Sequence, residues 1–79
     1  GRYYFFTESA VKESLTAHRY YLQVYDPEQR RIVWTSPQSF TLSSAPHIAS
    51  FQNNGVWISK HSNGEKPIGE FTVPKEYMN

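Results

Sequence analysis

The sequence of 79 residues contains no cysteine, so no disulfide and no thiolate metal site can hold the fold together. Chains of this size bury only about 60% of the surface that they expose when unfolded, and small scaffolds without cross-links depend on packing alone. Aromatic residues compensate here, since the sequence holds 2 Trp, 6 Tyr and 5 Phe. Each such side chain can bury roughly 150–250 Å². We therefore expect a fold in which aromatic side chains carry much of the packing.

The composition is that of a folded globular domain. Hydrophobic residues make up 38% of the chain and the net charge is only +1, whereas disordered chains combine low hydrophobicity with high net charge. So small a charge supplies no large field to attract nucleic acid or acidic lipid. No apolar run approaches the ~20 residues that a membrane-spanning helix needs. The length predicts a single domain over residues 1–79, and the lack of a long apolar run predicts no membrane span.

The first 17 residues carry two different patterns. An aromatic run within Arg2–Phe6 favours a β-strand. In the segment Thr7–Ala17, Val11 and Leu15 stand four positions apart and no Gly or Pro intervenes. The first residue of that segment is a suitable helix cap, and Glu8 would suit the first helical turn. We predict one short helix over 7–17, with a polar connection as the alternative interpretation.

Residues 19–36 give the clearest structural prediction, a β-hairpin. Apolar side chains alternate with polar ones on both arms, and Asp26-Pro27-Glu28-Gln29 between them matches the preferences of a type I turn. The register that joins apolar residues sets Tyr25 opposite Arg31. It brings these pairs together on one face: Val24 with Ile32, and Leu22 with Trp34.

The rest of the chain predicts a meander of short strands. Phe40 and Leu42 alternate with polar residues, and Asn54-Gly55 and Asn63-Gly64 are hairpin signals. Those two turns would set Phe51 opposite Ile58, and Val56 opposite Phe71.

Proline residues mark the last predicted strand. Pro67 has no N–H to donate, so the strand over 66–73 should lie at a sheet edge, and Pro74 should end it before a frayed end or a single turn. The whole pattern predicts a mainly β fold, a small antiparallel sandwich or barrel of five to seven short strands, with the N-terminal helix as an optional addition.

No signature of catalysis or of metal binding is present. His18, His47 and His61 are separated by 29 and 14 residues, which matches no metal-ligand pattern. The sequence has no G-x-S-x-G nucleophile elbow, and its isolated glycines form no phosphate-binding loop. Its carboxylates are scattered, as expected of solvated surface charges. We predict that the protein is not an enzyme and needs no metal and no cofactor.

Aromatic side chains beside polar ones, on the hairpin faces opposite the predicted core, indicate a recognition surface. The competing interpretation is that a second layer covers these faces and that their aromatic residues are core. The candidate ligand-binding residues are Tyr21, Tyr25 and Arg31 in the first hairpin, and Gln52, Trp57, His61 and Glu70 in the second.

These patterns favour a non-catalytic interaction module. A protein partner, bound through a sheet face or an edge strand, ranks first, because an edge strand such as the one that starts at Pro67 offers unpaired backbone groups for strand addition. A carbohydrate that stacks on the surface aromatic residues is the alternative. Nucleic acid ranks third, since Asp26 and Glu28 flank the best basic pair, Arg30-Arg31. A small hydrolase ranks last.

Overall fold

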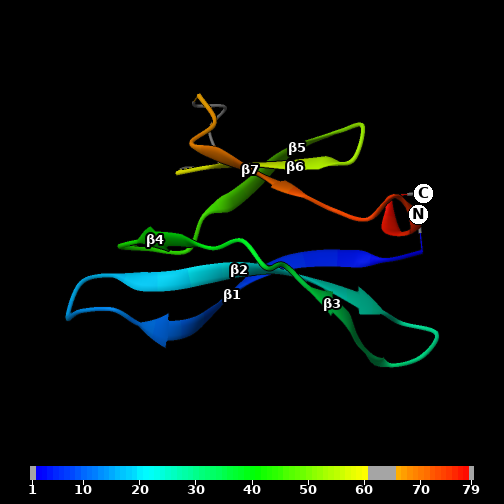
Figure 1. The fold of residues 1–79 in the computed structure, drawn as a ribbon, viewed down its shortest axis with the longest axis horizontal. Helices are drawn as coiled ribbons and strands as arrows, with labels where there is room; N and C mark the ends of the chain where they lie inside the picture. The colour runs from blue at the N-terminus through cyan, green and yellow to red at the C-terminus, as the bar shows by residue number, and fades with distance from the viewer. Residues whose placement is uncertain (1, 61–65, 79) are drawn as a thin grey trace.

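Two antiparallel sheets stack face to face in the computed structural model, which describes residues 2–60 and 66–78 (Figure 1). The elements along the chain are β1 (Tyr4–Lys12), β2 (His18–Asp26), β3 (Arg31–Thr35), β4 (Phe40–Leu42), β5 (His47–Gln52), β6 (Gly55–Ser59), β7 (Gly69–Thr72) and the 3₁₀ turn η1 (Lys75–Tyr77). Sheet A contains β1 to β4, and sheet B contains β5 to β7. The prediction of a small, mainly β, antiparallel sandwich is confirmed.

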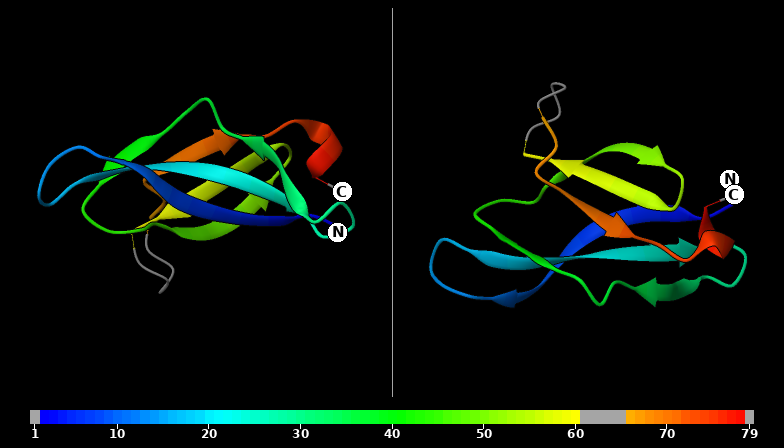
Figure 2. Two further views of the ribbon diagram at one scale, coloured as in Figure 1. Left: turned by 90° about the horizontal axis from the view of Figure 1, so that it is seen from below. Right: turned by 45° about the horizontal axis from the view of Figure 1, so that its top comes forward.

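Each sheet is organised around one central strand. In sheet A, β2 pairs with β1 along one side, and on its other side it pairs with β3 near one end and with β4 near the other. In sheet B, β6 lies between β5 and β7. Figure 2 shows the two ends of the chain at the same end of the sandwich, where the rings of Tyr3 and Tyr77 meet edge to face at 5.1 Å.

The core lies between the sheets and draws on both central strands. Its fully buried side chains are Leu22 and Val24 from β2, Val56 and Ile58 from β6, and Phe71 and Val73 from the β7 region. Alternate residues of a strand point to the same side, so this one layer takes every second residue of each strand. Phe40 of β4 packs against this layer, with its ring edge to face with that of Phe71 and the ring centroids 5.0 Å apart.

The helix predicted over 7–17 is wrong, because residues up to Lys12 belong to β1. The backbone of β1 pairs with that of β2, with Phe5 opposite Val24 and Thr7 opposite Leu22. Leu15, one of the two apolar residues that suggested a helix, is 90% exposed. A short segment needs a packed apolar face to be stably helical. This segment instead gains backbone hydrogen bonds by pairing with β2.

The first hairpin forms as predicted, but its register differs by one residue. Tyr25 lies opposite Ile32 instead of Arg31, because the connection is one residue longer and Arg30 adopts a left-handed φ of 57°. Val33 is then an extra, bulged residue that brings Trp34 opposite Val24 instead of Leu22.

The second hairpin also forms with a shifted turn. Asn53 takes a left-handed φ of 56°, and Gln52 pairs with Gly55, so Phe51 lies opposite Val56 instead of Ile58. The predicted pairing of Val56 with Phe71 is confirmed. The second hairpin signal, Asn63-Gly64, lies outside the described residues.

The last strand is shorter than predicted. Strand β7 begins at Gly69 instead of residue 66, so Pro67 lies before the strand and not within it. Within the described sheets β7 pairs with β6 alone, and the prediction that it is an edge strand is confirmed. Pro74 comes directly before the single turn η1.

Candidate functional site

Figure 1 shows no described segment over the outward side of sheet A. This side of the sheet carries a group of apolar side chains. Burial alternates along β2, so that Leu22 and Val24 point into the core and the residues between them point outward. Cross-strand pairing places the outward residues of β1 and β3 beside those of β2. We call this group the aromatic face, and its members are Tyr4, Phe6, Tyr21, Tyr25 and Ile32.

One row of the aromatic face crosses three strands. Tyr25 lies between Tyr4 of β1 and Ile32 of β3. The rings of Tyr4 and Tyr25 are nearly parallel, at 18°, with their centroids 6.4 Å apart. Tyr4 is 62% exposed and Ile32 is 37% exposed, so the row presents apolar surface to solvent. The two rings thus lie side by side on neighbouring strands.

Polar groups border the remaining rows. Phe6 lies opposite Gln23, whose Nε2 donates a hydrogen bond of 3.1 Å to Oγ1 of Thr35. Toward the other end, Arg19 hydrogen-bonds Tyr21 and pairs with the carboxylate of Glu13, and both contacts raise the pKa of the Arg19 guanidinium. An aromatic centre with a polar rim is the usual composition of a protein–protein interface.

The outward side of sheet B carries the other predicted residues that the structure describes. Trp57 is half-buried on the central strand β6, opposite Glu70 of β7. The Glu70 carboxylate lies over Gly55, in the space that a Cβ would occupy there. Gln52 is exposed and lies opposite Gly55. His61 lies outside the described residues. Trp57, Glu70 and Gln52 therefore share one surface, on the opposite side of the sandwich from Tyr21 and Tyr25.

The sequence predicted that Arg31 shares a face with Tyr21 and Tyr25, but Arg31 does not lie on the aromatic face. The shifted register places it opposite Asp26, and its Nε donates a hydrogen bond of 3.0 Å to Oε1 of Gln29. Tyr4 and Phe6 lie on the aromatic face but were not among the predicted binding residues. Their alternation in the aromatic run was a visible signal, but only the pairing of β1 with β2 joins them to the outward residues of the first hairpin.

The edge strands of sheets A and B have features that disfavour pairing with another chain. An extra residue interrupts the ladder in each of three of them: Ala10 in β1, Val33 in β3 and Ala49 in β5. Such bulges twist an edge away from a flat template, and the central strands carry none of these extra residues. Strand β4 is only three residues long.

The edge of β7, which the sequence indicated for strand addition, is bridged by a side chain. The amide of Gln38, from the connection before β4, accepts a hydrogen bond of 3.0 Å from the Thr72 backbone N–H. Its Nε2 also lies 3.5 Å from the backbone carbonyl of Glu70, as a donor. Gln38 thus occupies two of the outward backbone groups that an added strand would use.

Replacing Gln38 with alanine should open this edge. We expect the free energy of unfolding to fall by about 1 kcal/mol, because two hydrogen bonds are lost, and self-association to rise as the edge becomes available. Urea titration and sedimentation velocity measure the two effects. Gln52→Ala is the matched control, since it removes an exposed glutamine from sheet B. Equal stability and equal sedimentation of the two variants would contradict the bridging role.

Among the described residues, no group of three or more His, Asp or Glu side chains could hold a metal ion. None of the helical segments in that part of the chain is long and apolar enough to cross a membrane. Comparison of the sequence and structure with protein-family models, curated proteins and solved structures finds no match.

Proposed function

We propose that this protein is a non-catalytic recognition module that binds a protein partner through the aromatic face. The observation that carries the proposal is the gathering of Tyr4, Phe6, Tyr21, Tyr25 and Ile32 on one uncovered side of sheet A. A partner that binds such a surface buries exposed apolar area, and this needs no change of fold. Tyrosine suits this role because its rigid ring offers a large contact area and its hydroxyl can hydrogen-bond at the margin.

The state of the sheet edges favours binding by the face over binding by strand addition. The bulges in β1, β3 and β5 and the Gln38 bridge on β7 leave no long, regular edge in the described sheets for an incoming strand. A flat sheet surface remains available. We therefore replace the edge strand with the aromatic face as the docking surface for a protein partner.

Carbohydrate binding is the second candidate, and the outward side of sheet B supports it. The half-buried indole of Trp57 lies opposite Glu70, with the exposed amide of Gln52 at the adjacent hairpin end. A sugar ring could stack on the indole while the carboxylate and the amide bind its hydroxyl groups. This site lies away from the aromatic face, so the two candidates can be tested separately.

Site-specific photocrosslinking tests the proposal. We would place a benzoylphenylalanine at Tyr25 on the aromatic face or at exposed Thr72 on the outward side of sheet B. The expected result is a discrete protein adduct from position 25 and not from position 72. With that protein purified, the double variant Tyr4→Ser/Tyr25→Ser should bind it at least tenfold more weakly, because two aromatic contact surfaces are removed.

The control separates binding from folding. Trp57→Ser changes the opposite side of the sandwich and should leave affinity for the crosslinked partner unchanged. Adducts from position 72 alone, or an unchanged affinity of the Tyr4→Ser/Tyr25→Ser variant, would contradict the proposal. Binding to a glycan array that Trp57→Ser abolishes would favour the carbohydrate candidate instead.

A further inference from the structure

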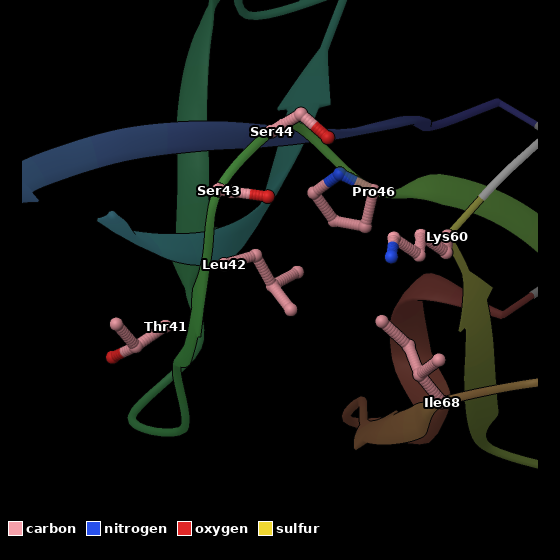
Figure 3. A pocket seen from close by; sticks show the side chains of 7 residues that line it. All are labelled: Thr41, Leu42, Ser43, Ser44, Pro46, Lys60 and Ile68. Atoms are coloured by element: carbon pink, nitrogen blue, oxygen red, sulfur yellow. The ribbon is translucent and has the colours of Figure 1, made fainter. Parts of the chain in front are cut away.

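A cavity of about 280 Å³ opens between the sheets, at the end where β4 and the connection after it face the ends of β6 and β7 (Figure 3). It lies away from both outward sheet surfaces. Apolar side chains line part of it: Leu42 of β4, Pro46 and Ile68. Ile68 is 42% exposed although it is aliphatic. Contact with an apolar group would therefore bury exposed apolar surface of this wall, which is favourable.

The rest of the cavity wall is polar and carries one positive charge. Ser43 and Ser44 contribute hydroxyl groups, and Lys60, directly after β6, contributes an ammonium group. Figure 3 shows the Lys60 side chain turned toward Leu42 across the opening. Among the described residues, no carboxylate lies within ion-pair distance of this ammonium. The cavity thus combines an apolar wall, hydroxyl donors and a cation that has no counter-charge within residues 2–60 and 66–78.

We propose that this cavity binds a small alkyl carboxylate, with the carboxylate at Lys60 and the alkyl group against Leu42 and Ile68. Lysine ammonium and serine hydroxyl groups both donate to a carboxylate, and a charged hydrogen bond is stronger than a neutral one. A water molecule occupies roughly 30 Å³ in the liquid, so a cavity of about 280 Å³ has room for a ligand of several non-hydrogen atoms. Hexanoate is a simple ligand of this class.

Two sources can supply this chemistry: a free short-chain fatty acid, and the C-terminal carboxylate of a peptide that ends in an aliphatic residue. The cavity is partly open to solvent, so the chain of a peptide could continue outward. Hexanoate represents the first source, and N-acetyl-leucine represents the second. Hexan-1-ol and N-acetyl-leucinamide are the matched ligands without a carboxylate.

Titration of the ¹⁵N-labelled full chain with each ligand, followed by NMR, tests the proposal. We expect saturable shifts in the amide signals of Leu42, Ser43 and Ile68, with a dissociation constant that is roughly millimolar for so small a ligand. The alcohol and the amide should bind about tenfold more weakly than the carboxylates. Binding of only one carboxylate would identify the source and support the site.

Variants locate the charge. Lys60→Met keeps the length of the side chain and should weaken carboxylate binding about tenfold, while the weak binding of hexan-1-ol stays the same. Lys66→Met is the matched control, because Lys66 is exposed and does not line the cavity. The proposal is overturned if neither carboxylate gives saturable shifts at these amides, or if Lys60→Met and Lys66→Met affect affinity equally.

Discussion

Phe71→Ala is expected to remove a large part of the free energy of unfolding of the protein. The Phe71 side chain is fully buried at the centre of the layer between the sheets, in edge-to-face contact with Phe40 at 5.0 Å. Removing a buried phenylalanine costs about 3–5 kcal/mol, through lost transfer free energy and the cavity that remains. A chain of this length has a total free energy of unfolding of about 4–12 kcal/mol. Urea titration, followed by circular dichroism, measures the loss.

Two further variants keep this prediction testable if Phe71→Ala does not fold. Phe71→Leu retains most of the apolar volume and should cost less than the alanine variant, so its unfolding transition stays measurable. Phe51→Ala is the control, because Phe51 is 53% exposed and should lose no more than about 1 kcal/mol. If Phe71→Leu and Phe51→Ala both matched the parent protein, the observed position of the core would be wrong.

The stability of the protein is expected to decrease as the pH falls from about 4 to about 2, and much of this decrease should depend on Asp26. The Asp26 carboxylate is fully shielded from solvent, and Nη2 of Arg2 donates a hydrogen bond of 2.7 Å to it. The backbone N–H of Glu28 and the Nε2 of Gln29 donate two more, each of 2.9 Å. The hydrogen bond from Arg2 is the main cause that lowers the pKa of Asp26 from 3.8 to about 2.

The direction of this effect follows from proton linkage. Near pH 3 the carboxyl group at position 26 is largely protonated in the unfolded chain and ionised in the folded chain, so acid favours unfolding. The contribution of Asp26 is fully present above pH 4 and is lost as the pH falls through the folded pKa of about 2. The urea midpoint of the parent protein should therefore fall in this range.

Variants isolate the contribution of Asp26. In Asp26→Asn this part of the pH dependence should disappear. In Arg2→Met it should become shallower, because the pKa of Asp26 moves back toward its ordinary value. Glu28→Gln is the control, since the Glu28 side chain is 74% exposed and its carboxylate lies 3.6 Å from Nε of Arg2, farther than the 2.7 Å between Arg2 and Asp26. Equal slopes below pH 4 for the parent protein and Asp26→Asn would contradict the assignment.

The candidate site was predicted in part from local patterns. The alternation along β2 identified Tyr21 and Tyr25 as lying opposite the core face of the hairpin, and the structure places both on the outward side of sheet A. Tyr4 and Phe6 could not be added, because they join that surface only through pairing across the loop between β1 and β2. The cavity at Lys60 is formed by segments distant in sequence, so no local pattern marked it.

The sequence by itself determined the features that depend on neighbouring residues. Alternation of apolar side chains predicted the strands around Leu22 and Val56, and turn chemistry predicted the hairpins at Asp26 and Asn54. Proline predicted that β7 is an edge strand, since it removes a backbone donor.

Only the tertiary structure decided the features that depend on distant partners. The segment from Thr7 to Lys12 became part of a strand because β2 offered it backbone hydrogen-bonding partners, in a ladder that a bulge at Ala10 interrupts. The registers of both hairpins shifted by one residue or more because Arg30 and Asn53 adopted left-handed conformations and single residues bulged out of the edges. Each choice differs from its alternative by only a few kcal/mol of local free energy, so the packing of one sheet on the other selects among them.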